Sequence, residues 1–319
     1  MTNTKNLTEG GLLTALAVVF ALLALNLPVL GVVVMFLYPL PLLVLTYKQG
    51  LKTGLLSMLA TFFLLAMLID PVLALRFTVG SLIASLVIGI GFRAQKPATY
   101  ILLTGLVAEL ISIVLGFLLV FAITGINPID SQVQLMQETM QEALAINESL
   151  GLSQEDLAQQ QQGTELILDI LGIILPSGLI FAGLLATWLN YLIGGQIIKR
   201  LGGEVPSLPP FGTWKLPSAI ALVFGFSLLA IYWGSSRDLT LLYEAGINGF
   251  IISLIFGFIQ GANMLKALFI RFNIANFIYI FTLIFVMLNP FLAQIVAFAG
   301  LIDMLFNYTQ RLYQRKDRV

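Results

Sequence analysis

One acidic residue lies in the middle of a long apolar stretch and is the first candidate for chemistry. Glu109, in the segment TGLVAELISIVLG, follows Gly105 by four residues and precedes Ser112 and Gly116 by three and seven. In a helix these four residues share one small, polar face. An ionisable side chain at membrane depth is costly and suggests a function. Two interpretations stay open: Glu109 binds a ligand or a proton, or it makes a structural hydrogen bond to a neighbouring helix.

Other polar residues could line an outward-facing pocket. Asp70 and Arg76 bracket a turn in the segment DPVLALR and could pair across it, which would be a structural role. With Glu244 and Arg237 they are also the charges available to such a pocket, and asparagines in apolar segments add to the set. The residues predicted to bind a ligand or a proton are therefore Glu109, Asp70, Arg76, Asn190, Glu244 and Asn248.

The residues needed for most enzyme chemistry are missing. The chain has no Cys and no His, which excludes disulfides, thiol chemistry, histidine acid–base catalysis and zinc sites with the usual ligands. It has no Gly-x-x-x-x-Gly-Lys-Ser/Thr phosphate loop, no HExxH and no Gly-x-Ser-x-Gly. We therefore expect no catalytic residue, no metal, no cofactor and no ATPase motor within the chain, which is not expected to be an enzyme.

The amino-acid composition indicates the environment that surrounds the chain. Of 319 residues, 59% are hydrophobic and only 10% are charged, whereas soluble domains carry roughly 25% charged residues. A soluble core could not bury so much apolar surface, so the lipid bilayer is the expected surrounding. The net charge is zero, which gives no electrostatic basis for a nucleic-acid partner.

Breaks at Pro, Gly and charged residues divide the chain into ten apolar segments, near the ~20 residues that a span requires. These are 8–26, 29–47, 51–69, 72–92, 98–123, 166–196, 217–234, 240–263, 271–288 and 290–308. We expect an all-α polytopic helix bundle of about ten transmembrane helices. Its parts are an N-terminal five-helix region (1–124), an extracytoplasmic acidic insert (125–163), and a C-terminal five-helix region with a short basic tail (164–319).

The basic residues predict the orientation. With the N-terminus in the cytoplasm and ten alternating spans, 14 of the 16 Lys and Arg residues fall on the inner side, as the positive-inside rule requires. Only Arg76 and Arg237 fall outside. Both termini are therefore predicted to be cytoplasmic, and the compartment is predicted to be a bacterial cytoplasmic membrane.

The insert is acidic and amphipathic. Between Gln137 and Gln162 it holds five acids and no Lys or Arg, as expected of a translocated segment. A helical apolar stripe, a start at Asp130 or Ser131, a stop at 147–151 and a second start at Ser153 predict helices on the outer surface. The stripe consists of Val133, Met136, Met140 and Leu144. Such helices could form a lid over a site near Asp70, Arg76 and Glu244; disorder is the alternative.

Small residues recur at helical spacing in two places. Gly249, Ser253, Gly257 and Gly261 follow one another every four residues, and Ala17 and Ala21 have the same spacing. Such stripes let another helix approach closely. They serve either packing within the chain or docking of a partner subunit.

The segments EGGLLTALAVVFALLAL, PLPLLVLTYKQGLKTGLLS and GLIDMLFNYTQR resemble the YybS-like bacterial membrane proteins, the family of unknown function numbered 2232. This resemblance covers most of the chain. The first five or six spans also resemble the substrate-binding S subunits of energy-coupling factor transporters, through Ala17 and Ala21 and through a Pro-containing second helix followed by a Gly-rich turn. The second resemblance implies a small-molecule ligand and an energising membrane partner, but S subunits have about six spans and no such insert.

Two functional hypotheses follow. The first is a small-molecule transporter, or a substrate-binding membrane subunit without its own ATPase, which rests on Glu109 and on helices broken by Pro. The second is a non-transporting scaffold that assembles or regulates envelope machinery, which rests on the glycine stripe and the external insert. A retained small molecule, as opposed to co-purified proteins, would discriminate between them.

Overall fold

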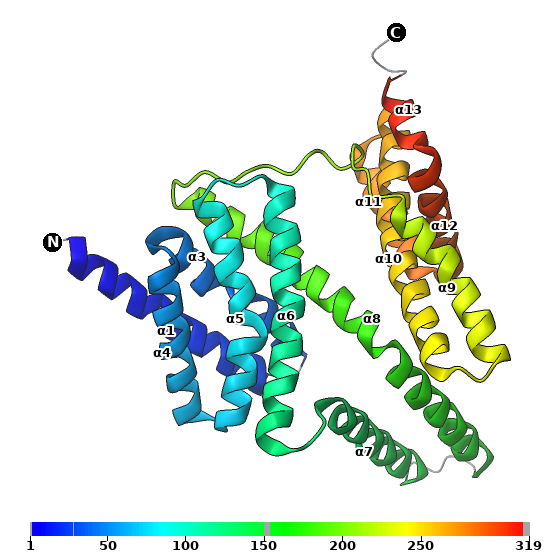
Figure 1. The fold of residues 1–319 in the computed structure, drawn as a ribbon, viewed down its shortest axis with the longest axis horizontal. Helices are drawn as coiled ribbons and strands as arrows, with labels where there is room; N and C mark the ends of the chain where they lie inside the picture. The colour runs from blue at the N-terminus through cyan, green and yellow to red at the C-terminus, as the bar shows by residue number, and fades with distance from the viewer. Residues whose placement is uncertain (1, 28, 150–153, 315–319) are drawn as a thin grey trace. The chain divides into compact units, whose positions relative to one another are not determined.

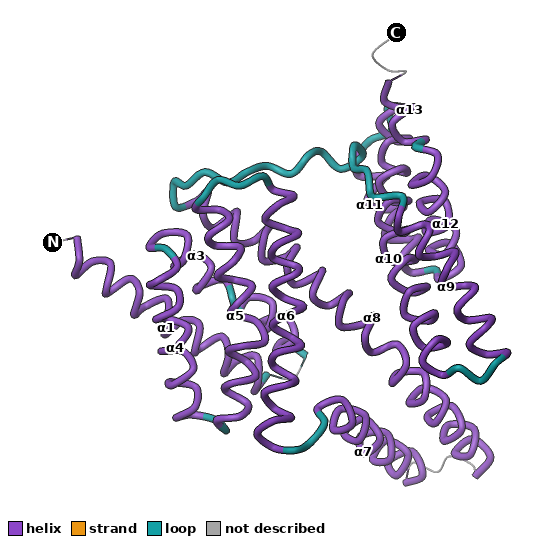
Figure 2. Tube along the Cα trace, viewed as in Figure 1, coloured by secondary structure: helices purple, strands orange, loops and turns teal. Residues whose placement is uncertain are grey.

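The computed structural model describes residues 2–27, 29–149 and 154–314, and in these ranges the secondary structure is helical, without strands (Figures 1 and 2). The helices are α1 (Thr2–Asn26), α2 (Leu30–Leu37), α3 (Leu40–Gln49), α4 (Leu51–Leu68), α5 (Pro71–Arg93), α6 (Ala98–Thr124), α7 (Pro128–Ser149), α8 (Gln154–Arg200), α9 (Ala219–Ser236), α10 (Thr240–Arg271), α11 (Asn276–Leu288), α12 (Pro290–Phe306) and α13 (Tyr308–Gln314). An all-α membrane helix bundle is thereby confirmed.

The chain forms two compact units, which are described separately. Unit 1 comprises 1–164 and 182–208, and unit 2 comprises 165–181 and 209–319. Helix α8 therefore contributes residues to both units. The sequence predicted three consecutive regions with boundaries at 124 and 163, and these regions stay a prediction. The two units, in contrast, each combine two separate stretches of the chain.

The number of spans is lower than the ten expected. Within the described residues, eight helices are long and apolar enough to cross a membrane, and a ninth span results if α11 and α12 count as one broken span. These two helices, of 13 and 17 residues, are bent by 112° at the Asn289–Pro290 junction. Each alone is shorter than the ~20 residues that a span requires, which is why two expected spans become one bent pair.

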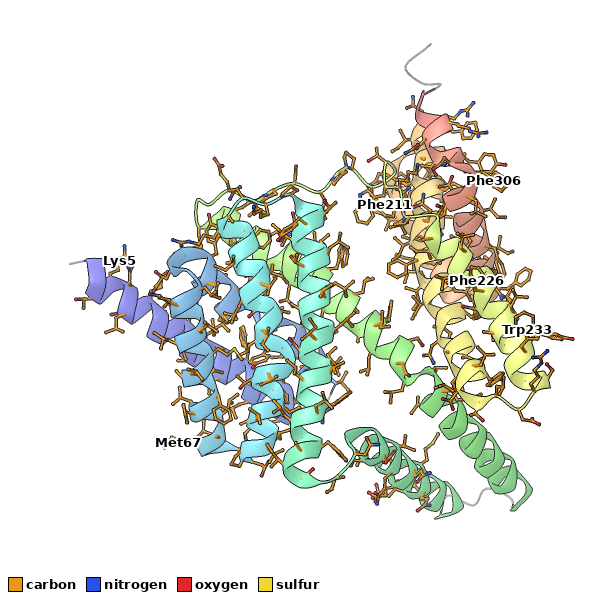
Figure 3. The ribbon with its side chains drawn as sticks, viewed as in Figure 1. Lys5, Met67, Phe211, Phe226, Trp233 and Phe306 are labelled. Atoms are coloured by element: carbon orange, nitrogen blue, oxygen red, sulfur yellow. The ribbon has the colours of Figure 1, made fainter. Side chains whose placement is uncertain are left out.

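The lateral surface of the helices is apolar. Met67 on α4, Phe226 on α9 and Phe306 at the end of α12 are all exposed (Figure 3). Many further Leu, Ile, Val and Phe side chains are exposed in the same way. A water-soluble monomer rarely exposes so much contiguous apolar surface, so these faces are suited to contact with lipid.

In unit 1, the buried core forms where α3, α5 and the C-terminal part of α8 meet. Leu43, Ile88, Phe92, Tyr191 and Ile198 are almost completely buried in one cluster. On another side of α3, a second cluster joins α1 to α4 and α5, and it includes Ala21. Both alanines of the predicted docking stripe, Ala17 and Ala21, are fully buried within unit 1, so they pack internally.

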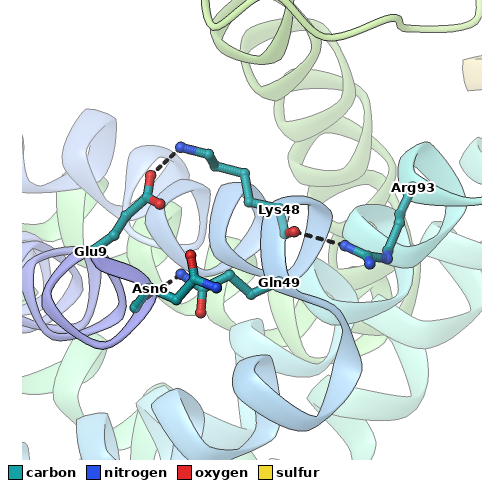
Figure 4. A network of polar contacts seen from close by, with 5 residues as sticks. All are labelled: Asn6, Glu9, Lys48, Gln49 and Arg93. Atoms are coloured by element: carbon teal, nitrogen blue, oxygen red, sulfur yellow. Dashed lines mark hydrogen bonds and ion pairs between the residues drawn. The ribbon is translucent and has the colours of Figure 1, made fainter. Parts of the chain in front are cut away.

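Polar contacts connect three helices at one end of unit 1 (Figure 4). Lys48 on α3 pairs with Glu9 on α1, and the Gln49 side chain donates to the Asn6 carbonyl over 2.9 Å. Arg93, in the last turn of α5, donates to the carbonyls of Tyr47 and Lys48 over 2.9 and 2.7 Å. The guanidinium thus caps the C-terminal end of α3, whose final carbonyls have no partner within the helix.

In unit 2, α10 packs tightly against α9 and α12 through glycines. A methyl group on Gly257 would lie 2.7 Å from the Ala297 carbonyl oxygen, and one on Gly261 would overlap the Val296 carbonyl. Nearer the start of α10, a methyl group on Gly249 would overlap the Ser227 hydroxyl of α9, and Ser253 is fully buried. The glycine stripe of α10 is therefore covered by helices of its own unit.

The acidic insert is helical where it is described. Helix α7 covers 128–149 and begins at Pro128, a residue well suited to the first helical position, so it starts two residues before the expected Asp130. The expected stop around Gly151 and the start at Ser153 lie outside the described residues, as do the side chains of Met136 and Leu144. The expected second short helix is the beginning of α8, which continues for 47 residues into the membrane-spanning segment.

Candidate functional site

Glu109 lies on a buried face of α6, in unit 1. Gly105, Glu109, Ser112 and Gly116 are all buried, and Glu109 retains only 7% exposure. Gly105 touches α5, because a methyl group there would lie 2.8 Å from the Ile88 side chain. The spacing of these residues thus correctly placed the small, polar face of α6 inside the bundle.

Helix α8 runs antiparallel to α6 across this face. A methyl group on Gly183 would lie 3.5 Å from Cγ of Glu109, and one on Gly105 would lie 3.1 Å from Cγ2 of Thr187. Glu109 and Thr187 are therefore one helical turn apart along the same interface. Side chains of a helix lean toward its N-terminus, so in this antiparallel pair each of the two leans toward the other.

Two polar atoms of α8 in this region are buried without a hydrogen-bond partner among the described residues. They are the Thr187 hydroxyl oxygen and the Asn190 amide oxygen, on residues that are 2% and 5% exposed. The Asn190 amide nitrogen donates back to the Ala186 carbonyl over 2.9 Å, which directs the amide toward the turn that carries Thr187. Unpartnered buried polar atoms are rare in proteins and require an explanation.

Glu109 itself has no partner in the described part of the chain, by hydrogen bond or by ion pair. Its neighbour Ser112 donates to the Ala108 carbonyl instead, over 2.6 Å. The structural hydrogen bond considered for Glu109 is thus absent from the ranges described. A buried carboxyl group without a partner can bind a proton or a cation, and the facing helix α8 carries two further buried oxygen atoms without partners.

Asp70 and Arg76 do not form the pair that their spacing suggested. Asp70 caps α5, accepting from the backbone N–H groups of Val72 and Leu73 over 2.9 and 3.0 Å. The Arg76 guanidinium lies over the Phe117 ring at 5.6 Å, two turns along α6 from Glu109. Both residues thus have local structural contacts, and neither touches Glu109.

Asn248 in unit 2 has a clear role in holding α8. Its Oδ1 accepts from the Ser177 backbone N–H over 2.9 Å, and its Nδ2 donates to the Ile173 carbonyl over 2.7 Å. An undistorted helix would join this N–H to this carbonyl, but Pro176 interrupts α8 here. The side-chain amide therefore bridges the two backbone groups beside the proline. Glu244 contributes its backbone carbonyl to the same amide, over 2.9 Å.

A second polar network in unit 2 is fully satisfied. Asp303 accepts from the Thr309 N–H and hydroxyl, each over 2.7 Å, and from the Gln260 amide over 2.6 Å. Asn263 accepts from Gly212 and Trp214 N–H groups over 2.7 and 3.1 Å and donates to the Trp214 carbonyl over 2.8 Å. This network fixes the 209–216 segment and the α12–α13 junction to α10, and it has a structural character.

Thr187 was missed by sequence reasoning. A Thr in an apolar helix is ordinarily satisfied by the carbonyl four residues earlier, so it attracted no attention. The available signal was the spacing of Gly183, Thr187, Asn190 and Gly194, which repeats the small, polar pattern of the Glu109 face.

Comparisons with known proteins agree with the fold. Residues 15–304 match the family model described as "Predicted membrane protein (DUF2232)". The "Uncharacterized protein YybS" of Bacillus subtilis (strain 168) is 24% identical over 315 residues, covering 98% of this chain and all of that protein. No solved structure matches the chain. These matches lend no support to the likeness to S subunits.

Proposed function

Because the chain belongs to the DUF2232 family of predicted membrane proteins, we propose that it acts within the bilayer as a small-molecule transporter or a substrate-binding membrane subunit. It has no ATPase motif of its own, so an energising partner or an ion gradient supplies the energy. Catalysis is not part of this proposal.

The observation that carries the proposal is the unpartnered, buried Glu109 between α6 and α8. An isolated charge at membrane depth costs several kcal/mol, so a structural role would require a partner for it. The residues described supply none, and two further unpartnered polar groups lie on the facing helix. Such an arrangement favours a binding role over a structural one.

Retained cargo tests the proposal. The wild-type protein and Glu109→Gln would be purified gently and analysed by mass spectrometry for bound small molecules. We expect cargo with the wild type and at least a tenfold loss with the variant, because glutamine keeps the shape and loses the charge. Asp238→Asn is the matched control, since Asp238 is exposed and its positive φ of 53° suits asparagine. Equal retention by all three proteins would contradict the role of Glu109.

A scaffold for envelope machinery is the second candidate, and the exposed helix α7 favours it. Asp130, Glu138 and Glu142 are exposed on α7, which has no basic residue, so the charge that it presents is negative. The glycine stripe of α10 no longer favours this candidate, because α9 and α12 cover it. Specific co-purification of envelope proteins that is lost on deleting 131–147, without any retained small molecule, would support the scaffold.

Both termini lie in the cytoplasm of a bacterium in this proposal. Eight full spans return the chain to its starting side, provided that α11 and α12 enter and leave the membrane on one side. The bend of 112° between them supports such a re-entrant course. A full ninth span would move the basic residues 311–318 to the outer side, against the positive-inside rule.

A further inference from the structure

Three side chains whose oxygen atoms have no partner among the described residues are on two facing helices of unit 1. Glu109 is on α6, and Thr187 and Asn190 are on α8, three residues apart and hence on one helical face. A methyl group on Gly105 of α6 would contact Thr187, and one on Gly183 of α8 would contact Glu109. The interface therefore carries a carboxyl, a hydroxyl and an amide oxygen, which are oxygen ligands of the kind that hard cations prefer.

The ionisable groups around this interface are directed elsewhere. Arg76 of α5 lies over Phe117, and Arg93 binds the α3 carbonyls. The Tyr191 hydroxyl of α8 donates to the Pro206 carbonyl. The other ionisable groups of α6, α7 and α8 whose side chains are described lie at helix ends or on the exposed surface of α7: Lys96, Tyr100, Lys199, Arg200, Asp130, Glu138 and Glu142. No described cation therefore compensates an ionised Glu109.

We propose that Glu109, Thr187 and Asn190 form a binding site for one small monovalent cation, a sodium ion or a proton, that competes for the Glu109 carboxyl. This inference rests on the proposed function, because it names the ion taken up at the same site. The charge balance sets the class: one carboxylate is neutralised by one positive charge, whereas a divalent ion would leave an excess charge in an apolar interior.

The packing sets the size of the ligand. Helices α6 and α8 approach so closely that a single methyl group on Gly105 or Gly183 would already contact the opposite helix. This close approach limits the ligand beside Glu109 to a small ion or a proton. A larger organic cation would have to move the helices apart.

Thermal unfolding of the purified full chain tests the site. The probes are NaCl against equal choline chloride, each over a pH series from 5 to 8.5, and the proteins are the wild type, Glu109→Gln, Thr187→Val and the control Asp238→Asn. A ligand that binds only the folded state raises Tm. With sodium at about 100 times its Kd, we expect a rise of roughly 5 °C.

The sodium effect has a defined sign with pH. Sodium binds the ionised carboxylate, so its stabilisation is present at high pH and disappears as the pH falls and a proton takes its place. The effect is absent in Glu109→Gln at every pH and weakened roughly tenfold in apparent affinity in Thr187→Val. Asp238→Asn behaves like the wild type.

Each outcome decides the inference. A sodium-dependent Tm that requires Glu109 identifies sodium as the ion. The proton is the ion if sodium leaves Tm unchanged and the pH dependence of Tm differs between the wild type and Glu109→Gln. In that case the wild type and Asp238→Asn show the same pH dependence. Identical sodium and pH responses in the wild type and Glu109→Gln overturn the site. Cargo retention is measured separately, so an ion site without cargo refutes the transporter alone, and cargo without an ion response refutes only this inference.

Discussion

Buried polar residues of this chain fall into two kinds, and their hydrogen bonds separate them. Asp303, Gln260 and Asn263 have partners for their buried oxygen and nitrogen atoms. The Thr187 hydroxyl and the Asn190 amide oxygen have no hydrogen-bond partner among the described residues, and none is found there for Glu109 either. A satisfied network stabilises the fold, whereas an unsatisfied set at membrane depth is costly and is consistent with a ligand.

The first prediction concerns Asp303. Asp303→Ala removes the acceptor of three hydrogen bonds and leaves the Gln260 amide and the Thr309 groups without it, so the free energy of unfolding should fall by about 3 kcal/mol. Asp303→Asn should lose less, because one oxygen can still accept from the Thr309 N–H. Thermal or denaturant unfolding in detergent measures both, with Asp238→Asn as the control. An Asp303→Ala protein as stable as the wild type would show that the network is dispensable.

The sequence predicted the burial of Glu109 correctly, since the spacing of Gly105, Ser112 and Gly116 determines one helical face. It did not predict that Asp70 would cap α5 or that Arg76 would lie over Phe117. The Asp70 carboxylate can either pair with Arg76 or cap the helix, and the sequence does not show which of the two interactions forms. The bridge between Asn248 and the Pro176 break joins residues about 70 positions apart, a pairing that no local pattern encodes.

In unit 2, the helices are joined by close backbone approaches and by a side-chain bridge at a helix break. The glycines of α10 permit the first, and Asn248 provides the second. Both features stand out only weakly in the sequence, because glycine stripes and prolines are frequent in membrane helices. The bend between α11 and α12 was not predicted, since an Asn-Pro pair fits a turn between two full spans equally well.

Gly257→Leu tests the approach of α10 to α12. The first carbon of the new side chain would lie 2.7 Å from the Ala297 carbonyl oxygen, so the helices must separate, and stability should fall by about 3 kcal/mol. Gly225→Leu on α9 is the matched control, because nothing lies within 4 Å of that position, and its Tm should stay the same or rise. Equal Tm values for the two variants would show that α12 can move away from α10 without a loss of stability.

Substitutions of Asn248 test the bridge in α8. Asn248→Leu removes the side-chain amide that bridges the Ser177 N–H and the Ile173 carbonyl. We therefore expect the free energy of unfolding to fall by about 1–2 kcal/mol. Asn248→Asp can accept from Ser177 but cannot donate to Ile173, and it adds a charge, so it should lose more. Asn273→Asp, in an exposed turn, controls for the chemical change. If the aspartate variant were the more stable of the two Asn248 substitutions, the donation to Ile173 would be unimportant.

At the scale of the whole molecule, the topology assigns each segment to one side of the membrane. The native chain has no Cys, so single cysteines report their side without background. Composition and charge were sufficient to predict a multi-pass membrane protein, but they could not distinguish ten spans from the proposed eight spans with a re-entrant pair. Both arrangements place the same basic residues inside.

Labelling of intact cells with an impermeant thiol reagent tests the topology. Ser235→Cys, near the end of α9, should react from outside, whereas Ala94→Cys and Gln310→Cys should react only after the membrane is opened. All three positions are exposed, so burial does not interfere. Reaction of Gln310→Cys from outside would mean that α11 and α12 cross the membrane together as a ninth span, and reaction of Ala94→Cys would reverse the whole orientation.

The bridge at Pro176 has one more consequence, for how α8 responds to its surroundings. An asparagine amide has no net charge and does not titrate, so its bonds to Ser177 and Ile173 are not screened by salt and do no work against the transmembrane potential. Glu109, which faces a different stretch of the same helix, carries a charge whenever it is ionised and therefore experiences that potential. Helix α8 thus combines a joint that is insensitive to membrane voltage with a face opposite a voltage-sensitive residue.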